Sequence, residues 1–258
     1  MSIIRLGSVD STNRYCEALD LSQVEDFTCY WALEQTAGIG QRGNSWASAP
    51  GENLTFSLVL HPTWLPAARQ FKLTQMMSLG VLDFLNDIKG FKDPNGINAI
   101  VKWPNDIYAR MSNTTEGSEC HTYGKICGML VSNKIVGDSM ATAICGIGFN
   151  VNQREFPEWV PHPTSLSLLT DKQFELEPTL TKLLDCIERR YAELKDGKNL
   201  EPEYLSHLMN MGTAARYRHN GQELTATITG VDQHGRLLLT TEEGERLCCA
   251  MKEIEMIF

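Results

Sequence analysis

The sequence predicts an α+β protein: a mixed β-sheet with helices packed on it, followed by a small all-β module. Two observations support this prediction. Strand-like and helical apolar patterns mix over most of the chain without the strict alternation of a parallel α/β fold. After about residue 211, short strand-like runs separated by Asn-Gly, His-Gly and Glu-Gly turns replace them, as in a small β-barrel. We therefore expect one domain at residues 1–208 and a second at residues 209–258.

A short helix is expected directly after the Asp-Ser-Thr-Asn sequence at residues 10–13. Asp10 or Ser11 can cap this helix, which leaves its N-terminus available to face a ligand. Strands are expected at residues 29–33 and 54–60, and the second alternates large apolar residues with smaller ones. A glycine-rich loop connects these two strands.

Two longer segments show the apolar spacing of amphipathic helices. The first covers residues 71–85, and its pattern predicts a helix that belongs to the core. The second begins near Pro178, which suits a first helical turn, and ends before Gly197. The remaining predicted strands are apolar runs bounded by turn formers or interrupted by glycines. They lie at residues 97–102, 126–132, 141–151, 224–228, 236–240 and 246–250.

The composition describes an ordinary globular protein of 258 residues, with 42% hydrophobic and 21% charged residues. A net charge of −9, with no cluster of Lys and Arg, argues against binding to DNA or to anionic membranes. No apolar stretch approaches the roughly 20 residues that span a bilayer, and the N-terminus lacks a signal peptide. We therefore expect a cytoplasmic protein. Its eight cysteines lack metal-binding spacing and are expected to be reduced core thiols.

Polar side chains gather where a predicted buried strand ends. The strand at residues 97–101 is followed by Lys-Trp-Pro-Asn-Asp at residues 102–106. Because proline cannot continue a strand ladder, Lys102, Asn105 and Asp106 are expected to lie together where the chain leaves the sheet. The ends of strands are common ligand sites in proteins that combine helices with a sheet. A functional cluster is therefore predicted here.

Three further segments combine glycines with residues that can bind a ligand. The loop at residues 37–46 contains three glycines and suits either an anion-binding loop or a mobile hairpin. Gly-Lys-x-x-Gly at residues 124–128 places Lys125 at the mouth of an apolar strand, facing either a bound anion or solvent. Residues 146–152 offer either an amide contact to a purine or a bulged strand with an Asn turn. None of the three segments decides the function alone.

Taken together and in this order, these motifs resemble the biotin protein ligase family. The match runs from about residue 3 to residue 167 and includes Glu-Gln-Thr-Ala-Gly at residues 34–38, Gly-Asn-Ser-Trp at residues 43–46 and Pro-Thr-Ser-Leu at residues 163–166. Lys-Trp-Pro-Asn-Asp and Gly-Lys-x-x-Gly are its most specific elements. The resemblance implies a catalytic domain like that of class II aminoacyl-tRNA synthetases. The β-rich tail is similar to the family's SH3-like domain.

The resemblance implies a reaction in two steps. Biotin and ATP first form biotinyl-5′-AMP, and the biotinyl group then passes to one lysine of a biotin carboxyl carrier protein domain. Mg²⁺ and a fixed cation are expected to offset the repulsion between the biotin carboxylate and the α-phosphate. By family position Lys125 is that cation and, with Asp106, is assigned as catalytic. Asp106 is also the candidate Mg²⁺ ligand, whereas Lys102 is expected to have a structural role.

The remaining family positions divide into two sets. One set is expected to bind the ureido ring and chain of biotin through amides, hydroxyls and bare backbone. The other is expected to bind the adenylate, with an aromatic ring against the adenine and an amide at the purine edge. The biotin set comprises Ser11, Thr12, Asn13, Gln35, Gly38, Ile39, Gly40, Gln41, Lys125, Gly128 and Gly148. The adenylate set comprises Arg42, Trp46, Asn105, Lys125 and Asn150.

The glycine loop departs from the family pattern. Most members carry Gly-Arg-Gly-Arg, whereas this chain has Gly38, Ile39, Gly40 and Gln41. Arg42 lies one position later, so either it supplies part of the missing charge or the loop works through backbone N–H groups. We therefore hypothesise that this chain holds its adenylate less tightly than relatives with both arginines.

Two other functions stay open at this point. A lipoate–protein ligase shares the fold and the adenylate chemistry, but Asp-Ser-Thr-Asn and Lys-Trp-Pro-Asn-Asp favour biotin. A non-catalytic protein that binds biotin or its adenylate is disfavoured by Lys125, because simple binding has little need for that cation. Only nine residues precede Asp10, so the resemblance is to the short form of the family without an N-terminal DNA-binding domain. The sequence leaves open whether the protein is a monomer or a homodimer.

Overall fold

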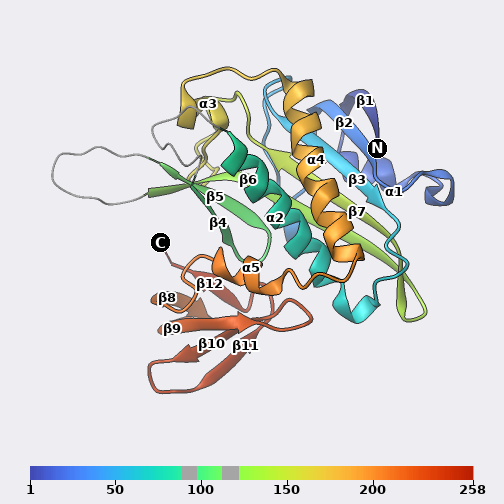
Figure 1. Cartoon of the computed structure of the whole chain (residues 1–258). Coiled ribbons are helices and arrows are strands. Elements are labelled where there is room, and N and C mark those ends of the chain that lie inside the picture. Colours follow the sequence, from blue (N-terminus) through green and yellow to red (C-terminus); the bar gives the residue numbers. More distant parts are fainter. Residues whose placement is uncertain (89–97, 112–121, 258) are drawn as a thin grey trace.

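The computed structural model describes residues 1–88, 98–111 and 122–257, which form two β-sheets with helices packed on the larger one (Figure 1). The seven-stranded sheet lies within residues 2–149, and the five-stranded sheet lies within residues 214–256. This arrangement confirms the predicted α+β fold. None of the helices in these described residues is long and apolar enough to cross a membrane.

The larger sheet is mixed because only its first two strands are parallel. The strand order is β1-β2-β3-β7-β6-β5-β4, and every neighbouring pair apart from β1 and β2 is antiparallel. β7 is therefore the central strand, and its glycines lie deep within the sheet. The strands are β1 (Ser2–Val9), β2 (Thr28–Gln35), β3 (Leu54–Leu60), β4 (Ala99–Lys102), β5 (Asp106–Met111), β6 (Thr122–Val136) and β7 (Ser139–Phe149).

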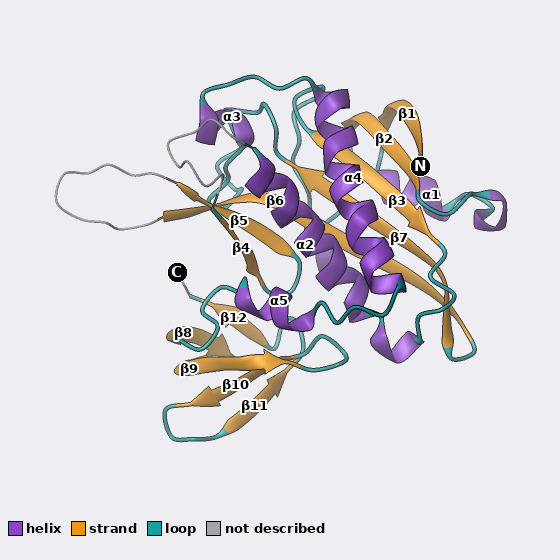
Figure 2. Ribbon diagram, in the orientation of Figure 1, coloured by secondary structure: helices purple, strands orange, loops and turns teal. Residues whose placement is uncertain are grey.

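Two long helices lie side by side across one face of the larger sheet (Figure 2). They are α2 (Phe71–Asp87) and α4 (Leu176–Lys195), and each agrees with its predicted range to within two residues at either end. Gly80 of α2 permits their close approach, because a Cβ there would lie 2.9 Å from the Cα of Ile187 on α4. The shorter helices are α1 (Thr12–Glu17), α3 (Leu166–Thr170) and α5 (Glu201–Ser206), with 3₁₀ turns η1 (Leu21–Gln23), η2 (Gln41–Gly43) and η3 (Ala67–Arg69).

The alternation of side chains along β3 separates the core from the opposite face of the sheet. Its even-numbered residues are large and apolar, and they are fully buried in the core that includes α2 and α4. Its odd-numbered residues Thr55, Ser57 and Val59 point to the other face, where α1 packs. Because α1 has only six residues, it covers part of this face and leaves a cavity beside it.

The second sheet is antiparallel, with the strand order β11-β10-β9-β8-β12. It contains the three predicted strands and two that the apolar pattern does not reveal, β8 and β12. In β8, Arg216 and Arg218 interrupt the apolar pattern. The sheet agrees with the expected SH3-like module, whose proposed start is residue 209. Its strands are β8 (Ala214–His219), β9 (Gln222–Val231), β10 (Leu237–Thr241), β11 (Arg246–Cys249) and β12 (Ile254–Met256).

The chain between α5 and β8 connects the two sheets by pairing with β4. The Val101 N–H donates to the His207 carbonyl at 2.9 Å, and the Met209 N–H donates to the Val101 carbonyl at 2.8 Å. The indole Nε1 of Trp103 donates to the Gly235 carbonyl, in the turn between β9 and β10, at 3.0 Å. The second sheet therefore packs directly against the hairpin formed by β4 and β5.

Details of three elements differ from the predictions. Ser11 is the N-terminal cap residue of α1, but its side chain makes no capping hydrogen bond, and the Asp10 carboxylate accepts from the Ser11 N–H at 2.7 Å instead. β6 extends well beyond residues 126–132 because it forms a long hairpin with β7. Ile97, the predicted start of a strand, lies outside the described residues. Cys120 also lies outside them, and six of the seven described cysteines are buried.

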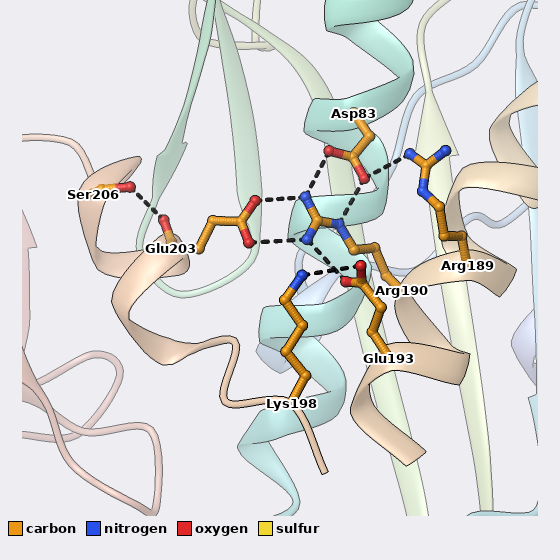
Figure 3. A network of polar contacts seen from close by, with 7 residues as sticks. All are labelled: Asp83, Arg189, Arg190, Glu193, Lys198, Glu203 and Ser206. Carbon is orange, nitrogen blue, oxygen red and sulfur yellow. Dashed lines mark hydrogen bonds and ion pairs between the residues drawn. The ribbon is translucent and has the colours of Figure 1, made fainter. Parts of the chain in front are cut away.

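A network of ion pairs joins α2, α4 and α5 (Figure 3). Arg190 of α4 donates to the Asp83 carboxylate at 2.6 and 2.7 Å and to the Glu203 carboxylate at 2.5 and 2.9 Å. The Arg190 side chain is only 9% exposed. Burial raises the pKa of Asp83, but hydrogen bonds from Arg190 and Arg189 outweigh burial and hold that pKa below its ordinary value. The network fixes α5 and thereby the segment that pairs with β4.

Replacing Arg190 with alanine is expected to lower the free energy of unfolding by about 2–3 kcal/mol, because the largely enclosed Asp83 carboxylate loses its two closest hydrogen bonds and Glu203 loses its charged partner. Arg189→Ala is the matched control. Arg189 contacts the same Asp83 at 3.0 Å, but its side chain is 56% exposed. Its expected loss is therefore below about 1 kcal/mol. Urea unfolding followed by circular dichroism measures both values, and equal losses would contradict the central place of Arg190.

Candidate functional site

The cavity beside α1 has a volume of about 120 Å³. It is bounded by the start of α1, the end of β2, the loop that follows β2, the turn between β4 and β5, and the middle of β6 and β7. Most of the residues predicted for the site are brought together here. They are Ser11, Thr12, Asn13, Gln35, Ile39, Gly40, Gln41, Trp46, Asn105, Asp106, Lys125, Gly128 and Gly148.

A β-bulge turns Lys125 toward this cavity. Side chains along a strand alternate between its two faces, and Gly128 of β6 lies on the cavity face. Regular alternation would therefore direct Ile126, and not Lys125, to the cavity. The pairing with β5 shifts at this point, because consecutive β5 residues pair with Cys127 and with Lys125. Ile126 is thus an extra residue, fully buried in the core, and Lys125 faces the cavity.

Lys125 and Asp106 form an ion pair inside the cavity. Their Nζ and Oδ2 atoms are 2.8 Å apart, and the two side chains are 24% and 23% exposed. Asp106 begins β5 and pairs with Gly128, so both residues face the same side of the sheet. The Nζ atom also lies 5.5 Å from the centre of the Trp46 ring. An anionic ligand that enters the cavity would therefore compete with Asp106 for a cation that is already in position.

The backbone of Lys125 is fixed by the segment that precedes α3. Its N–H donates to the His162 carbonyl at 2.7 Å, and its carbonyl accepts from the Thr164 N–H at 2.9 Å. Gly124 permits this contact, because a Cβ there would lie 2.7 Å from the Cβ of Thr164. The family resemblance predicts that Asn150 contacts the edge of a purine. In the structure Asn150 does not line the cavity and packs against the segment of Thr164. It is 4% exposed, and its Nδ2 donates to the Thr164 carbonyl at 3.0 Å.

The Lys-Trp-Pro-Asn-Asp sequence forms the turn of the hairpin between β4 and β5. Lys102 ends β4 and Asp106 begins β5, so the chain leaves the sheet and re-enters it within a few residues. Asn105 is 6% exposed, and its side-chain amide donates to the Met129 carbonyl of β6, which holds the turn against that strand. Lys102 places its Nζ 5.5 Å from the centre of the Tyr108 ring and does not line the cavity. Of the three clustered polar residues, Asn105 and Asp106 are therefore the two that face it.

Hydroxyl and amide groups from α1, β2 and β3 form one end of the cavity. The Oε1 atom of Gln35 accepts from the Thr12 N–H at 2.8 Å and from the Thr12 hydroxyl at 3.1 Å. Behind them, the buried hydroxyl of Ser57 hydrogen-bonds with Thr12 Oγ1 at 2.7 Å and with Asn13 Oδ1 at 2.6 Å. Thr12, Asn13, Gln35 and Ser57 are called the hydroxyl–amide network below. No motif in the sequence points to Ser57. The alternation of β3 indicates only that this residue lies on the face of the sheet that α1 covers.

Glycines leave the strands bare along the floor of the cavity. A Cβ at Gly148 would lie 2.2 Å from the Trp46 ring, and one at Gly128 would lie 2.8 Å from it. Two residues before Gly148, a Cβ at Gly146 would lie 2.1 Å from Oδ1 of Asn13. Bulky groups therefore approach the backbone of β6 and β7 directly. Along β7 the floor runs from the hydroxyl–amide network to Trp46 and the ion pair.

Other residues of interest lie at the edge of the cavity. Gly38 lines an adjoining groove, and a Cβ there would lie 2.6 Å from the Trp46 carbonyl oxygen. Arg42 belongs to η2, and its side chain lies outside the described part of the structure. Gln41 lines the cavity with its Oε1 buried and without a hydrogen-bond partner in the described residues. Met251, between β11 and β12, also lines the cavity although no motif marks it.

The fold and the cavity define a class of protein. A hydroxyl–amide network at one end of a bare floor and a lysine–carboxylate pair at the other suit an elongated small molecule with an uncharged polar head and an anionic tail. A family model for the Biotin/lipoate A/B protein ligase family matches residues 6–150, which is more than half of the chain. The chain belongs to this family, and the resemblance of its motifs is thereby confirmed.

Individual relatives agree with this assignment. The bifunctional ligase/repressor BirA of Bacillus subtilis is 28% identical over 92% of this chain and 68% of that protein. The biotin–[acetyl-CoA-carboxylase] ligase of Mycobacterium tuberculosis is 26% identical over 81% of this chain and 71% of that protein. A solved structure of biotin protein ligase from Aquifex aeolicus, in complex with biotin and ATP, has a TM-score of 0.76 and 27% identity. That similarity covers 99% of this chain and 98% of the Aquifex chain.

Gly146→Ala is expected to lower the free energy of unfolding by about 1–3 kcal/mol, because the added Cβ overpacks the buried contact with Asn13. Gly7→Ala in β1 is the matched control, since no atom lies within 4 Å of its Cβ position. Its expected effect is within about 0.5 kcal/mol. Thermal unfolding monitored by calorimetry compares the two variants. A Gly146→Ala protein as stable as the parent would contradict the close packing of Asn13 on β7.

Proposed function

We propose that this chain is a biotin–protein ligase, which activates biotin with ATP as biotinyl-5′-AMP and then transfers biotin to a lysine of a carboxylase carrier domain. The observation that carries the proposal is the ion pair of Lys125 and Asp106, set on the same bare floor as the hydroxyl–amide network. Family membership supports ligase chemistry. The names of the Mycobacterium and Aquifex relatives support biotin over lipoate.

The two ends of the cavity suit the two ends of biotin. The hydroxyl–amide network offers oriented donors and acceptors to the ureido ring, which is uncharged and needs such partners. Gly146 and Gly148 let Asn13 and Trp46 pack directly on the backbone of β7, which places both side chains along the path of the ring system and the chain. The carboxylate of biotin then points toward Lys125. Ser11, Ile39 and Gly40 complete the proposed biotin contacts around this path.

In the first step, a carboxylate oxygen of biotin attacks the α-phosphorus of ATP. The new oxygen–phosphorus bond is that of biotinyl-5′-AMP, while the bond to the β-phosphate oxygen breaks and pyrophosphate leaves with the electron pair. Two anions have to approach each other for this to happen. The ammonium of Lys125 offsets their repulsion and stabilises the charge that grows on the α-phosphate. Asp106 holds this ammonium in place before the substrates bind.

Asp106 is the proposed protein ligand for Mg²⁺. Magnesium usually takes one or two protein carboxylates together with substrate phosphates, so a single carboxylate in the cavity fits this ion. The Oδ1 atom of Asp106 lies 3.4 Å from the Cβ position of Gly128, while Oδ2 contacts Lys125. Groups of three or more His, Cys, Asp or Glu that could hold a metal are absent from the described residues, so the phosphates would supply most of its ligands. Bound Mg²⁺ would neutralise charge on the phosphates.

In the second step, the ε-amine of the carrier lysine attacks the acyl carbon of the adenylate. An amide bond forms, the bond between the acyl carbon and the phosphate oxygen breaks, AMP leaves with the electron pair, and a proton is released. Lys125 stays beside the phosphate and stabilises the departing AMP. Trp46 and Asn105 line the adenylate side of the cavity. Asn150 contributes by holding the segment that fixes the Lys125 backbone, and so acts as a positioning residue.

Lys125→Ala is expected to reduce biotin-dependent exchange of pyrophosphate into ATP by about 10²–10³-fold, the usual effect of losing one preorganised group at the developing charge. Lys134→Ala is the matched control, because Lys134 is an exposed lysine of the same strand, β6, and does not line the cavity. Its activity is expected to stay within threefold of the parent. Isotope exchange at saturating biotin, ATP and Mg²⁺ measures both rates.

Two outcomes of this experiment would contradict the proposal. Absence of exchange in the parent protein would favour a binding function without turnover. Exchange that depends on lipoate and not on biotin would favour the related lipoate ligase reaction. A run with the two acids in competition separates the second outcome from the first.

Gln41→Arg is expected to slow the release of biotinyl-5′-AMP from the protein. Gln41 lines the cavity and its Oε1 atom is buried without a partner in the described residues, so this position lacks the charge that an arginine brings to a phosphate. Gln41→Met, with similar length and no charge, is the control. The dissociation rate of labelled adenylate is the measurement. No slowing in Gln41→Arg would show that Arg42 already supplies the charge.

A further inference from the structure

A second pocket lies where three parts of the chain meet. It has a volume of about 440 Å³. Its walls come from the start of α2 with the turn before it, from the connection between α4 and α5, and from the turn between β9 and β10 (Figure 1). It shares no lining residue with the cavity described above. The ligase function proposed for that cavity therefore gives this pocket no role.

Packing around Phe71 holds the walls of this pocket in position. Gly235, in the turn between β9 and β10, has a φ of 85°, and a Cβ there would overlap the Phe71 ring. Phe71 also makes an edge-to-face contact with Tyr204 of α5, with ring centroids 5.7 Å apart. One aromatic side chain at the start of α2 is thus in contact with both of the other walls. The pocket is therefore shaped by packing contacts before any ligand binds, which lowers the cost of binding one.

The wall formed by the start of α2 is cationic. Arg69 of η3 and Lys72 in the first turn of α2 both line the pocket. Neither side chain forms an ion pair or a hydrogen bond with the described residues. No side chain caps α2, and no acidic residue lies in its first turn. The positive end of the dipole of this 17-residue helix therefore adds to two cations that have no anionic partner there.

Gln75, one turn further along α2, is a second and independent sign of a ligand. It lines the pocket and is only 5% exposed. Its side-chain amide forms no hydrogen bond with the described residues, although buried amides are usually paired. The amide is not among the fully enclosed polar atoms that lack a partner, so its remaining exposure opens into the pocket. A ligand oxygen in the pocket would accept from this amide.

The opposite wall limits the charge of the occupant. Asp232 lines the pocket, but its carboxylate lies 2.6 Å from the Arg236 guanidinium and accepts from the His234 and Arg236 N–H groups, both at 2.9 Å. Glu201, at the start of α5, lines the pocket and forms no ion pair with the described residues. The two cations and the helix end balance one dianionic group, whereas Glu201 repels any further negative charge. The pocket therefore favours a single phosphate over a polyphosphate.

We propose that this pocket binds a small organic monophosphate. Its phosphate group lies against Arg69, Lys72 and the first turn of α2, and accepts a hydrogen bond from Gln75. The rest of the molecule carries hydroxyl groups, because the amides of Asn199 and Gln233 in the lining offer both donors and acceptors. The ligand contacts α2 and the second sheet together, so it stabilises the junction between them. This inference is independent of the proposed ligase function.

Inorganic phosphate is the probe, titrated into the whole chain by isothermal titration calorimetry, with sodium chloride adjusted to hold the ionic strength constant. One saturable site is expected. Arg69→Ala combined with Lys72→Ala is expected to weaken binding at least about tenfold, because two charge-assisted contacts are lost. Gln75→Leu is expected to weaken it about threefold. Glu201→Gln is expected to tighten it about twofold, because a like charge is removed.

Lys134→Ala combined with Lys182→Ala is the charge-matched control, since both lysines are exposed and lie outside the pocket. This control and Lys125→Ala are expected to bind phosphate as the parent does. Absence of saturable binding in the parent would overturn the proposal. So would equal weakening in the two double variants, which would show a general effect of net charge. Loss of binding in Lys125→Ala would overturn it as well, because the phosphate would then occupy the cavity.

Discussion

The alternation of side chains along β6 is the constraint on which the site depends. A strand that buries apolar residues against α2 and α4 must also deliver a lysine to the opposite face, and one extra residue, Ile126, achieves this. Without the bulge, regular alternation would send the ammonium into the core, where an unpaired charge is strongly destabilising. The ion pair with Asp106 and the contact with Trp46 exist because Lys125 shares the face of Gly128.

The cavity combines a rigid floor with polar atoms that lack partners. Its floor is formed by the centre of the larger sheet, where the backbone is paired on both sides. Its wall, by contrast, contains the buried Nε1 of Trp46 and Oε1 of Gln41, both without hydrogen bonds in the described residues. Each such atom costs about 1–3 kcal/mol when buried and unsatisfied. A ligand group that reached either atom would satisfy it, which favours a ligand with hydrogen-bond donors and acceptors over a wholly apolar one.

Much of the fold follows from local patterns, whereas parts of the site depend on distant contacts. The periodicity of α2 and α4 and the alternation of β3 reveal these elements because each buries one continuous apolar face. Ser57 and Met251 are not evident from the sequence, because they reach the site through packing between segments far apart in the chain. The bulge is equally hidden, since Ile126 resembles any strand residue. Asn150 directly follows β7, which contributes Gly146 and Gly148 to the cavity. Its side-chain amide nevertheless donates to the Thr164 carbonyl and supports the loop before α3.

The hydrogen bond from Trp103 to Gly235 ties the motif that contributes Asp106 to a turn in the second sheet, and Met251, in the connection between β11 and β12, lines the cavity. The positions of the two sheets are therefore coupled. A substitution that moves the turn between β9 and β10 would break this hydrogen bond and remove a support of the hairpin of β4 and β5, and a substitution in the hairpin would do the same to the turn. A chimera of two family members should therefore take the turn between β9 and β10, the segment of Met251 and the hairpin of β4 and β5 from one parent, so that these contacts are kept.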